Sequence, residues 1–287
     1  MADAALRPRA EAAAAALPPL LVAAERVAAS VMQGVHGRRR TGQGETFWQY
    51  RTYEPGEPAG RIDWRESAKA ERLYVRETEW EAAQSLFLWC DSSASMDYAS
   101  SRNWPSKRRR ATLLTLALAA MLLRGGERVS LLGSGLAPAH GRATLDRVAH
   151  LLDGEARTAG LPEFEKLPRH GHMVWLSDFL APVETINRLV ARYADAGLKG
   201  HLFQVMDPAE ESLPFNGRVR FEGFEDESPL LIGRVEGIRD QYIDKLRLHR
   251  EALRAVTRLA GWSFGIHRTD AAPTQALLGL YRALAKD

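Results

Sequence analysis

A run of five apolar residues leads straight into a polar turn in the stretch Leu86-Phe87-Leu88-Trp89-Cys90-Asp91-Ser92-Ser93-Ala94-Ser95-Met96. Near-continuous apolar runs of this length are typical of strands that are buried on both faces, as in a parallel sheet. The turn that follows carries the pattern Asp-x-Ser-x-Ser. We therefore expect Asp91, Ser93 and Ser95 to lie where a core strand ends.

Beyond this stretch, apolar strand patterns alternate with helical ones. Further strands are predicted over residues 128–132, 173–176, 201–205 and 262–266. The predicted helices cover residues 107–124, 144–152, 182–196, 238–259 and 274–284. Such alternation implies right-handed crossovers and a mostly parallel sheet with helices on both faces. The predicted fold class is therefore α/β, doubly wound.

Two segments precede this α/β region. Residues 20–31 repeat apolar side chains at helical spacing, which predicts an amphipathic helix. It is expected to dock on its own domain in preference to a partner or a membrane surface. The following segment is polar, aromatic and irregular, with short strand patterns and a Pro-Gly turn. The sequence thus predicts an N-terminal helical segment over 1–36, an extension with short strands over 37–80 and an α/β domain over 81–287.

Composition narrows the class of protein. The 287 residues are 45% hydrophobic and 26% charged, as in an ordinary globular protein, and the formal net charge of +3 implies no strong electrostatic field. A single cysteine, Cys90, excludes an internal disulfide and a multi-cysteine zinc site. No run of roughly 20 apolar residues predicts a membrane span, and the N-terminus lacks a secretory layout. A cytoplasmic location is expected.

The Asp-x-Ser-x-Ser turn offers oxygen ligands to a divalent cation. In parallel sheets, ligands bind outside the carboxyl ends of the strands, and the predicted strand at 173–176 brings Asp178 to the same edge. Carboxylate and hydroxyl oxygens suit hard divalent cations, with Mg²⁺ as the first candidate and Mn²⁺ and Ca²⁺ as alternatives. A threonine would complete the set, with Thr144 as first candidate and Thr158 as its rival. The alternative is that Asp91 and the serines merely cap backbone amides.

At these positions the chain resembles a von Willebrand factor A (vWA) domain. The metal-ion-dependent adhesion site (MIDAS) of that family combines Asp-x-Ser-x-Ser with a threonine and an aspartate from separate loops. The resemblance implies that Ser93, Ser95 and Thr144 contact the ion directly. It further implies that Asp91 and Asp178 act through water, and that a partner's carboxylate fills the free coordination position.

A second stretch resembles a more specific bacterial family, the domain-of-unknown-function family fifty-eight (DUF 58). It runs through Tyr53-Glu54-Pro55-Gly56-Glu57, Arg61-Ile62-Asp63-Trp64 and Leu73-Tyr74-Val75-Arg76-Glu77. Members are commonly associated with MoxR-type AAA+ ATPases, in pairs thought to act in chaperone-like assembly or metal insertion. The resemblance therefore implies a cation-dependent interaction module that works with such an ATPase and is not an enzyme.

Two interpretations stay open for Arg61, Asp63 and Trp64. One is a buried Arg/Asp pair with an aromatic lid that ties the extension to the core, since buried charges usually persist because they are paired. The other is a docking surface for the ATPase. The first interpretation predicts that Asp63→Ala or Trp64→Ala lowers thermal stability more than it changes cation affinity.

Two further function classes are weaker alternatives. A metal-dependent hydrolase would use Asp178 or Asp97 to activate a bound water. Against it, the histidines show no ligand spacing, and the chain lacks a phosphate-binding glycine loop and a nucleophile elbow. A nucleic-acid binder would use the basic cluster Lys107-Arg108-Arg109-Arg110, although such runs are usually solvated helix charge.

Overall fold

The structure is a computed structural model of the 287-residue chain. It describes residues 19–34, 46–54, 58, 60, 62–69, 72–79, 84–154, 160–223 and 228–284. Contacts between residues divide the chain into two units. The main unit comprises residues 1–34 and 84–287, and the extension unit comprises residues 35–83.

A five-stranded parallel sheet forms the centre of the main unit, with the strand order β4-β3-β5-β6-β9. Its strands are β3 (Ser85–Cys90), β4 (Arg128–Leu131), β5 (His172–Ser177), β6 (Lys199–Met206) and β9 (Ser263–Arg268). The chain adds β4 on one side of β3 and then places β5 on the other side. The strand order therefore reverses between β3 and β5, which is where ligands bind in open α/β sheets.

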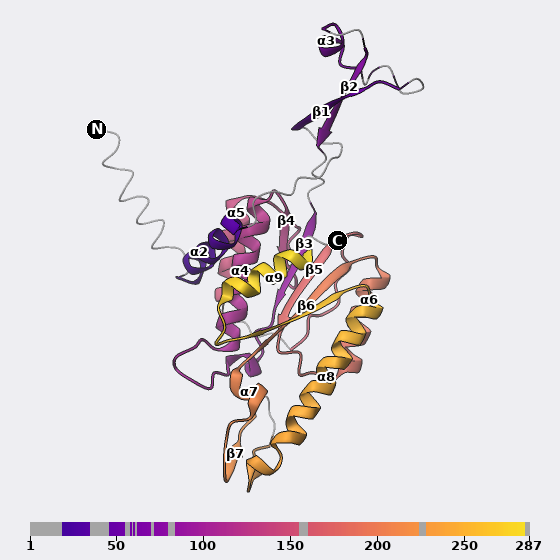
Figure 1. The fold of residues 1–287 in the computed structure, drawn as a ribbon. Helices are drawn as coiled ribbons and strands as arrows, with labels where there is room; N and C mark the ends of the chain where they lie inside the picture. Colours follow the sequence, from indigo (N-terminus) through magenta and orange to yellow (C-terminus); the bar gives the residue numbers. More distant parts are fainter. Residues whose placement is uncertain are drawn as a thin grey trace, which may run out of the picture. The chain divides into compact units, whose positions relative to one another are not determined.

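Helices cover both faces of this sheet (Figure 1). One face carries α2 (Pro19–Gly34), α4 (Lys107–Arg124), α5 (Arg142–Asp153) and α9 (Pro273–Leu284), and the other carries α6 (Val183–Asp195) and α8 (Arg239–Leu259). Because both faces are covered, β5 is buried at every position, which explains why the core strands are continuously apolar. The predicted α/β, doubly wound fold class is confirmed.

The N-terminal helix α2 packs on α4 and α9 of its own unit. Ala24, Ala28 and Val31 of α2 are buried, and their spacing of three and four residues places them on one helix face. Because α2 covers its outer side, α4 is buried almost all round, including its alanines. The expectation that the helix docks on its own domain is confirmed. None of the described helices is long and apolar enough to cross a membrane.

Shorter elements complete the described chain. In the main unit they are η2 (Ala94–Asp97), α7 (Pro208–Ser212), η3 (Val235–Gly237) and an antiparallel pair formed by β7 (Val219–Phe221) and β8 (Leu230–Ile232). The extension unit holds an antiparallel pair, β1 (Thr46–Thr52) and β2 (Tyr74–Glu79), with the short helix α3 (Trp64–Ser67) between them in sequence.

A cluster of aromatic rings packs around Trp175 of β5. The ring centroid of Trp175 lies 5.7 Å from that of Tyr193 and 5.4 Å from that of Trp262, in edge-on geometry. The Trp262 indole donates a hydrogen bond to the Leu198 carbonyl over 3.0 Å, which fixes the ring. A Cβ atom on Gly200 would lie 2.3 Å from this ring. Glycine at position 200 is therefore a packing requirement.

We expect Gly200→Ala to destabilise the fold by about 1–3 kcal/mol, because the added methyl forces the fixed Trp262 ring out of place. The matched control is Gly279→Ala in α9, where an added Cβ meets no atom within 4 Å. Alanine in a helix interior stabilises by up to about 1 kcal/mol relative to glycine. Urea unfolding of both variants checks this, and equal stabilities would contradict the packing argument.

Arg110 ties helix α4 to the turn that follows β9. Its guanidinium donates to the carbonyls of Thr269 and Ala271, over 2.7 and 2.6 Å, and lies 3.2 Å from Nε2 of His267. Burial, followed by the nearby Arg110 charge, lowers the pKa of His267 to about 4. The imidazole is therefore neutral in the folded protein at pH values where it would be half protonated in an unfolded chain.

We expect this histidine to make stability depend on pH. Between about pH 6.5 and 4, His267 is protonated in the unfolded chain but stays neutral in the folded protein. The free energy of unfolding therefore falls by about 3 kcal/mol as the pH drops through that window. The variant His267→Gln should show a shallower loss between pH 7 and 4 in urea unfolding. Parallel pH profiles for the two proteins would contradict the assignment.

Candidate functional site

Asp91 occupies a buried turn directly after β3. Its backbone amide extends the sheet by donating to the Leu176 carbonyl over 2.9 Å. Its side chain has no exposed surface. One carboxylate oxygen accepts a hydrogen bond from the Ser93 amide (2.8 Å), and the other accepts one from the Ser177 hydroxyl (2.6 Å). The carboxylate is therefore held in one orientation at the edge of the sheet.

The two motif serines continue this hydrogen-bonded chain of oxygens. The hydroxyls of Ser93 and Ser95 lie 3.2 Å apart, and that of Ser95 donates to Oδ2 of Asp178 over 2.8 Å. Met96, in the 3-10 turn η2 that follows, is fully buried and anchors the loop beneath them. The structure thus brings together Asp91, Ser93, Ser95 and Asp178, all at the point where the strand order reverses.

A buried lysine also belongs to this cluster. Lys107, the first residue of α4, has no exposed side-chain surface, and its ammonium donates to Asp178 (2.9 Å) and to Glu210 (2.5 Å). Burial alone would lower the pKa of Lys107, but the carboxylates of Asp178 and Glu210 outweigh it and raise the pKa. Burial raises the pKa of Glu210.

Glu210 reaches the site through a capping box at the start of α7. The Asp207 side chain accepts from the Ala209 amide (2.8 Å), and the Glu210 carboxylate accepts from the Asp207 amide (3.0 Å). The pattern Asp-Pro-x-Glu is the usual sequence signature of such a helix start. It could have predicted the cap, but no local pattern places residue 210 beside residue 107.

The carboxylates of Asp91 and Asp178 have different contacts. Asp178 is paired with Lys107, whereas Asp91 contacts hydroxyl and amide groups among the described residues. Burial raises the pKa of Asp91, and the hydrogen bonds from Ser177 and Ser93 offset this only in part. Buried carboxylates are normally paired with a base or with a metal ion. Asp91 is therefore the group in this cluster that a cation would stabilise most.

The donor set fits a hard divalent cation. It consists of carboxylate and hydroxyl oxygens, without sulfur or imidazole, which is the chemistry that Mg²⁺, Mn²⁺ and Ca²⁺ prefer. Within the described residues no three histidine, cysteine, aspartate or glutamate side chains gather to hold a metal ion. A cation at this position would therefore need the hydroxyls of Ser93 and Ser95 as ligands.

The structure corrects the expected position of Thr144. Its hydroxyl donates to the His140 carbonyl over 3.0 Å in the first turn of α5. Nearby, Arg142 and Arg124 both pair with Glu25, and Arg124 is the last residue of α4. Lys107 is the first residue of that 18-residue helix, which is about 27 Å long. Thr144 therefore lies at the opposite end of α4 from the cluster.

The path of the chain after β4 explains this error. Ala139 forms an antiparallel bridge with Val129, so the chain turns back along β4 before α5 begins. Helix α5 then runs toward the site, where the Gly154 carbonyl accepts from Arg108 over 3.3 Å. A Cβ on Gly160 would lie 4.0 Å from both Asp91 Oδ2 and Ser93 Oγ. Gly160 thus lies beside the site, while Thr158, the rival candidate, lies outside the described residues.

The basic cluster at 107–110 does not form one exposed patch. Lys107 and Arg110 are buried and bonded inside the protein, and Arg108 lies 3.6 Å from the Asp97 carboxylate. Affinity for nucleic-acid phosphates requires basic side chains that are gathered on an accessible surface. The alternative in which this cluster binds nucleic acid therefore loses two of its four basic side chains to burial. The sequence holds a second basic run, Arg38-Arg39-Arg40, which lies outside the described residues.

The extension unit gives a mixed result for its three predicted residues. Asp63 caps α3, and its side chain accepts from the amides of Arg65 (3.1 Å) and Glu66 (3.0 Å). Trp64 is 63% exposed, so the predicted burial of an aromatic lid is not found within this unit. Arg61 lies outside the described residues. A stability loss in Asp63→Ala stays a prediction, with helix capping as its reason.

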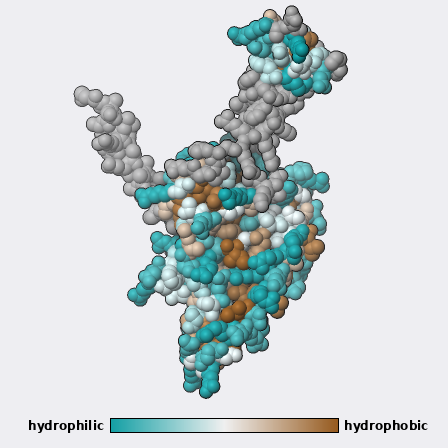
Figure 2. Space-filling view, viewed as in Figure 1, coloured by the Kyte–Doolittle hydropathy of each residue, from teal (hydrophilic) through white to brown (hydrophobic). Residues whose placement is uncertain are grey.

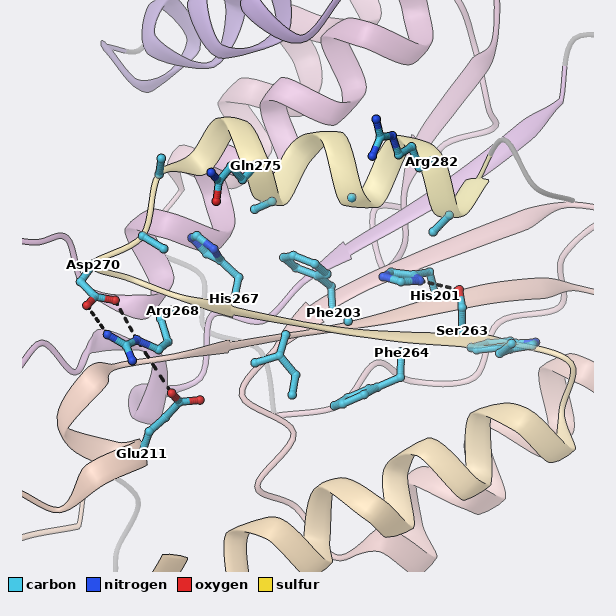
Figure 3. Close-up of a pocket in the computed structure, with 18 of the residues that line it drawn as sticks. His201, Phe203, Glu211, Ser263, Phe264, His267, Arg268, Asp270, Gln275 and Arg282 are labelled. Carbon is cyan, nitrogen blue, oxygen red and sulfur yellow. Dashed lines mark hydrogen bonds and ion pairs between the residues drawn. The ribbon is translucent and has the colours of Figure 1, made fainter. Parts of the chain in front are cut away.

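A cavity of about 860 Å³ lies elsewhere in the main unit, between β9 and α9 (Figure 3). Its floor is a row of rings from His201, Phe203 and His267, and Figure 2 shows apolar surface on this face below α9. None of the four clustered oxygen-bearing residues lines it. The cavity is therefore separate from the cluster around Asp91.

Relatives and solved structures give two kinds of likeness. The uncharacterised protein Rv1480 of Mycobacterium tuberculosis H37Rv is 26% identical over 275 residues, which cover 90% of this chain and 85% of the relative. The Mycobacterium bovis protein Mb1516 matches with the same identity and coverage.

Among solved structures, the conserved hypothetical protein BatB from Bacteroides thetaiotaomicron has a TM-score of 0.41 at 14% identity, covering 71% of this chain and 100% of that chain. The SpRpn10 VWA domain has a TM-score of 0.35 at 10% identity, covering 69% and 95% respectively.

The family comparison agrees with the predicted resemblance. The parallel sheet places Asp91 at the end of β3 and Asp178 after the neighbouring strand β5, as expected from the sequence. The model of the family described as "Protein of unknown function DUF58" matches residues 49–252, which is more than half of the chain. The chain therefore belongs to the DUF58 family.

Proposed function

We propose that this protein is a divalent-cation-dependent protein interaction module that carries out no reaction of its own. A cation, Mg²⁺ in the first place, is held by the hydroxyls of Ser93 and Ser95 and by the carboxylates of Asp91 and Asp178. The carboxylate of a partner protein completes its coordination. The observation that carries this proposal is the position of Asp91. Its carboxylate is fully buried and is held by a hydroxyl and an amide at the point where the strand order reverses.

Three features support this reading over a simple capping role. A capping aspartate needs one oxygen for the Ser93 amide, but the second oxygen of Asp91 is also buried and fixed by Ser177. Ser93 makes no side-chain cap to the 3-10 turn that follows it. Its hydroxyl is instead directed to Ser95. The polar side chains thus face one another, as ligands of a shared ion do.

We infer that the partner is a MoxR-type AAA+ ATPase and that the pair acts in chaperone-like assembly or maturation. This partner comes from the family resemblance. In the extension unit, Trp64 and Tyr50 are exposed aromatic side chains that such a partner could contact. Aromatic side chains are enriched among the residues that dominate binding energy at protein interfaces.

Cation binding is tested by calorimetric titration of chelator-stripped protein with MgCl₂ and MnCl₂. Asp91→Asn keeps the shape and one of the two accepting oxygens but removes the charge, so we expect cation affinity to fall at least about tenfold. Ser93→Ala should also lose binding, because it removes a ligand. The matched control is Thr144→Val, which removes a buried hydroxyl at the far end of α4 and should leave affinity unchanged. Equal affinities for the wild type and Asp91→Asn would sink the proposal.

Partner binding is tested by surface plasmon resonance against a MoxR-type ATPase from the same genome, with Mg²⁺ or with EDTA. Trp64→Ala should weaken binding about tenfold or more while leaving Tm unchanged, because this side chain is exposed. Leu230→Ala is the control, because it removes an equally exposed apolar side chain from β8 in the main unit. Binding that survives both EDTA and Trp64→Ala would contradict this choice of partner surface and mechanism.

A further inference from the structure

A lysine at the first position of α4 is unexpected from local energetics. Positive charge near a helix N-terminus opposes the helix dipole, and an ammonium group that has no exposed surface loses its hydration. Lys107 bears both costs. Among the described residues, its contacts to the carboxylates of Asp178 and Glu210 offset these costs. The position of this charge therefore depends on the oxygen cluster.

The contacts of Asp178 show how Lys107 acts on that cluster. Oδ2 of Asp178 accepts from both the Ser95 hydroxyl and the Lys107 ammonium, and Oδ1 accepts from the Leu180 amide over 3.2 Å. This carboxylate is thus already paired with a cation that belongs to the chain. Asp91 has no such contact in the described residues and keeps its charge for an external ion.

We propose that the Lys107 ammonium is an internal counter-cation that competes with the divalent cation for Asp178. It holds Asp178, Ser95 and Glu210 in place when no divalent cation is bound, and it lowers the affinity of the site for the ion. This inference rests on the proposed function, because it assigns Lys107 a role in the same site. A site that is weakened in this way binds the ion firmly only when a partner adds its own carboxylate.

The test compares Lys107→Met with the wild type in chelator-stripped full-length protein. Without divalent cations, the variant leaves Asp178 and Glu210 without their counter-ion, and we expect Tm to fall by about 5–10 °C. With saturating MgCl₂ or MnCl₂, the ion replaces the ammonium, so the rise in Tm should be larger in the variant than in the wild type. Calorimetric affinity for Mn²⁺ should be at least about tenfold higher in the variant.

Two further variants separate this effect from net charge and from misfolding. Arg108→Gln removes the neighbouring positive charge, which faces Asp97 and not Asp178, and should change Mn²⁺ affinity by no more than about threefold. The double variant Lys107→Met with Glu210→Gln removes one charge of each sign, so it keeps the net charge of the cluster and frees Asp178. It should fold and still bind Mn²⁺ more tightly than the wild type.

The outcomes distinguish this inference from the proposed function. Tighter Mn²⁺ binding and a larger cation-induced rise in Tm in the Lys107 variants, with little change in Arg108→Gln, support the counter-cation role. If the wild type binds Mn²⁺ and both Lys107 variants bind it with equal or lower affinity, this inference is overturned but the cation site is retained. Failure of the wild type and of the double variant to bind either ion overturns both.

Discussion

The buried carboxylate of Asp91 requires hydrogen-bond donors that hold it in place at the edge of the sheet. A charge without access to water must be fixed and compensated, and here the fixing comes from the Ser93 amide and the Ser177 hydroxyl at the end of two neighbouring strands. Those strands lie side by side because the chain reverses its winding between β3 and β5. The sheet topology thus brings two loops together, and the loops orient their oxygens toward one another.

The charges at this edge form a small network with one imbalance. Lys107 is shared by Asp178 and Glu210, so the side of the cluster near α7 carries its own cation. The side near Asp91 has only dipoles among the described residues. An external divalent ion would correct this imbalance, and its affinity would be set by how strongly Lys107 holds Asp178. The proposed cation binding and the proposed role of Lys107 are therefore two consequences of the same charge distribution.

Much of the fold could be predicted from the sequence because its signals are local. The continuous apolar run of β3 indicated a strand buried on both faces, and the helical spacing of Ala24, Ala28 and Val31 indicated a helix face that packs on its own domain. The convergence of Asp91 and Asp178 followed from a general rule, since the carboxyl ends of parallel strands share one edge.

The errors arose where the answer depends on the path of a loop or on distant packing. Thr144 was placed at the site because it stands where a loop enters a helix. The chain first doubles back along β4 at Ala139, so this helix begins at the edge of the sheet opposite the site. The burial of Lys107 was not predicted, because this residue belongs to a basic run and no local pattern distinguishes a buried lysine from an exposed one. Burial of Trp64 as an aromatic lid was one of two interpretations, and the structure leaves this side chain 63% exposed.

A crystal structure of the full chain with Mn²⁺ tests the central claim most directly. Manganese scatters anomalously, so its position can be assigned independently of the protein density. We expect an anomalous peak in contact with the hydroxyls of Ser93 and Ser95, beside Asp91. Saturating Mn²⁺ with no peak at these hydroxyls, or with a peak only elsewhere on the chain, would contradict it.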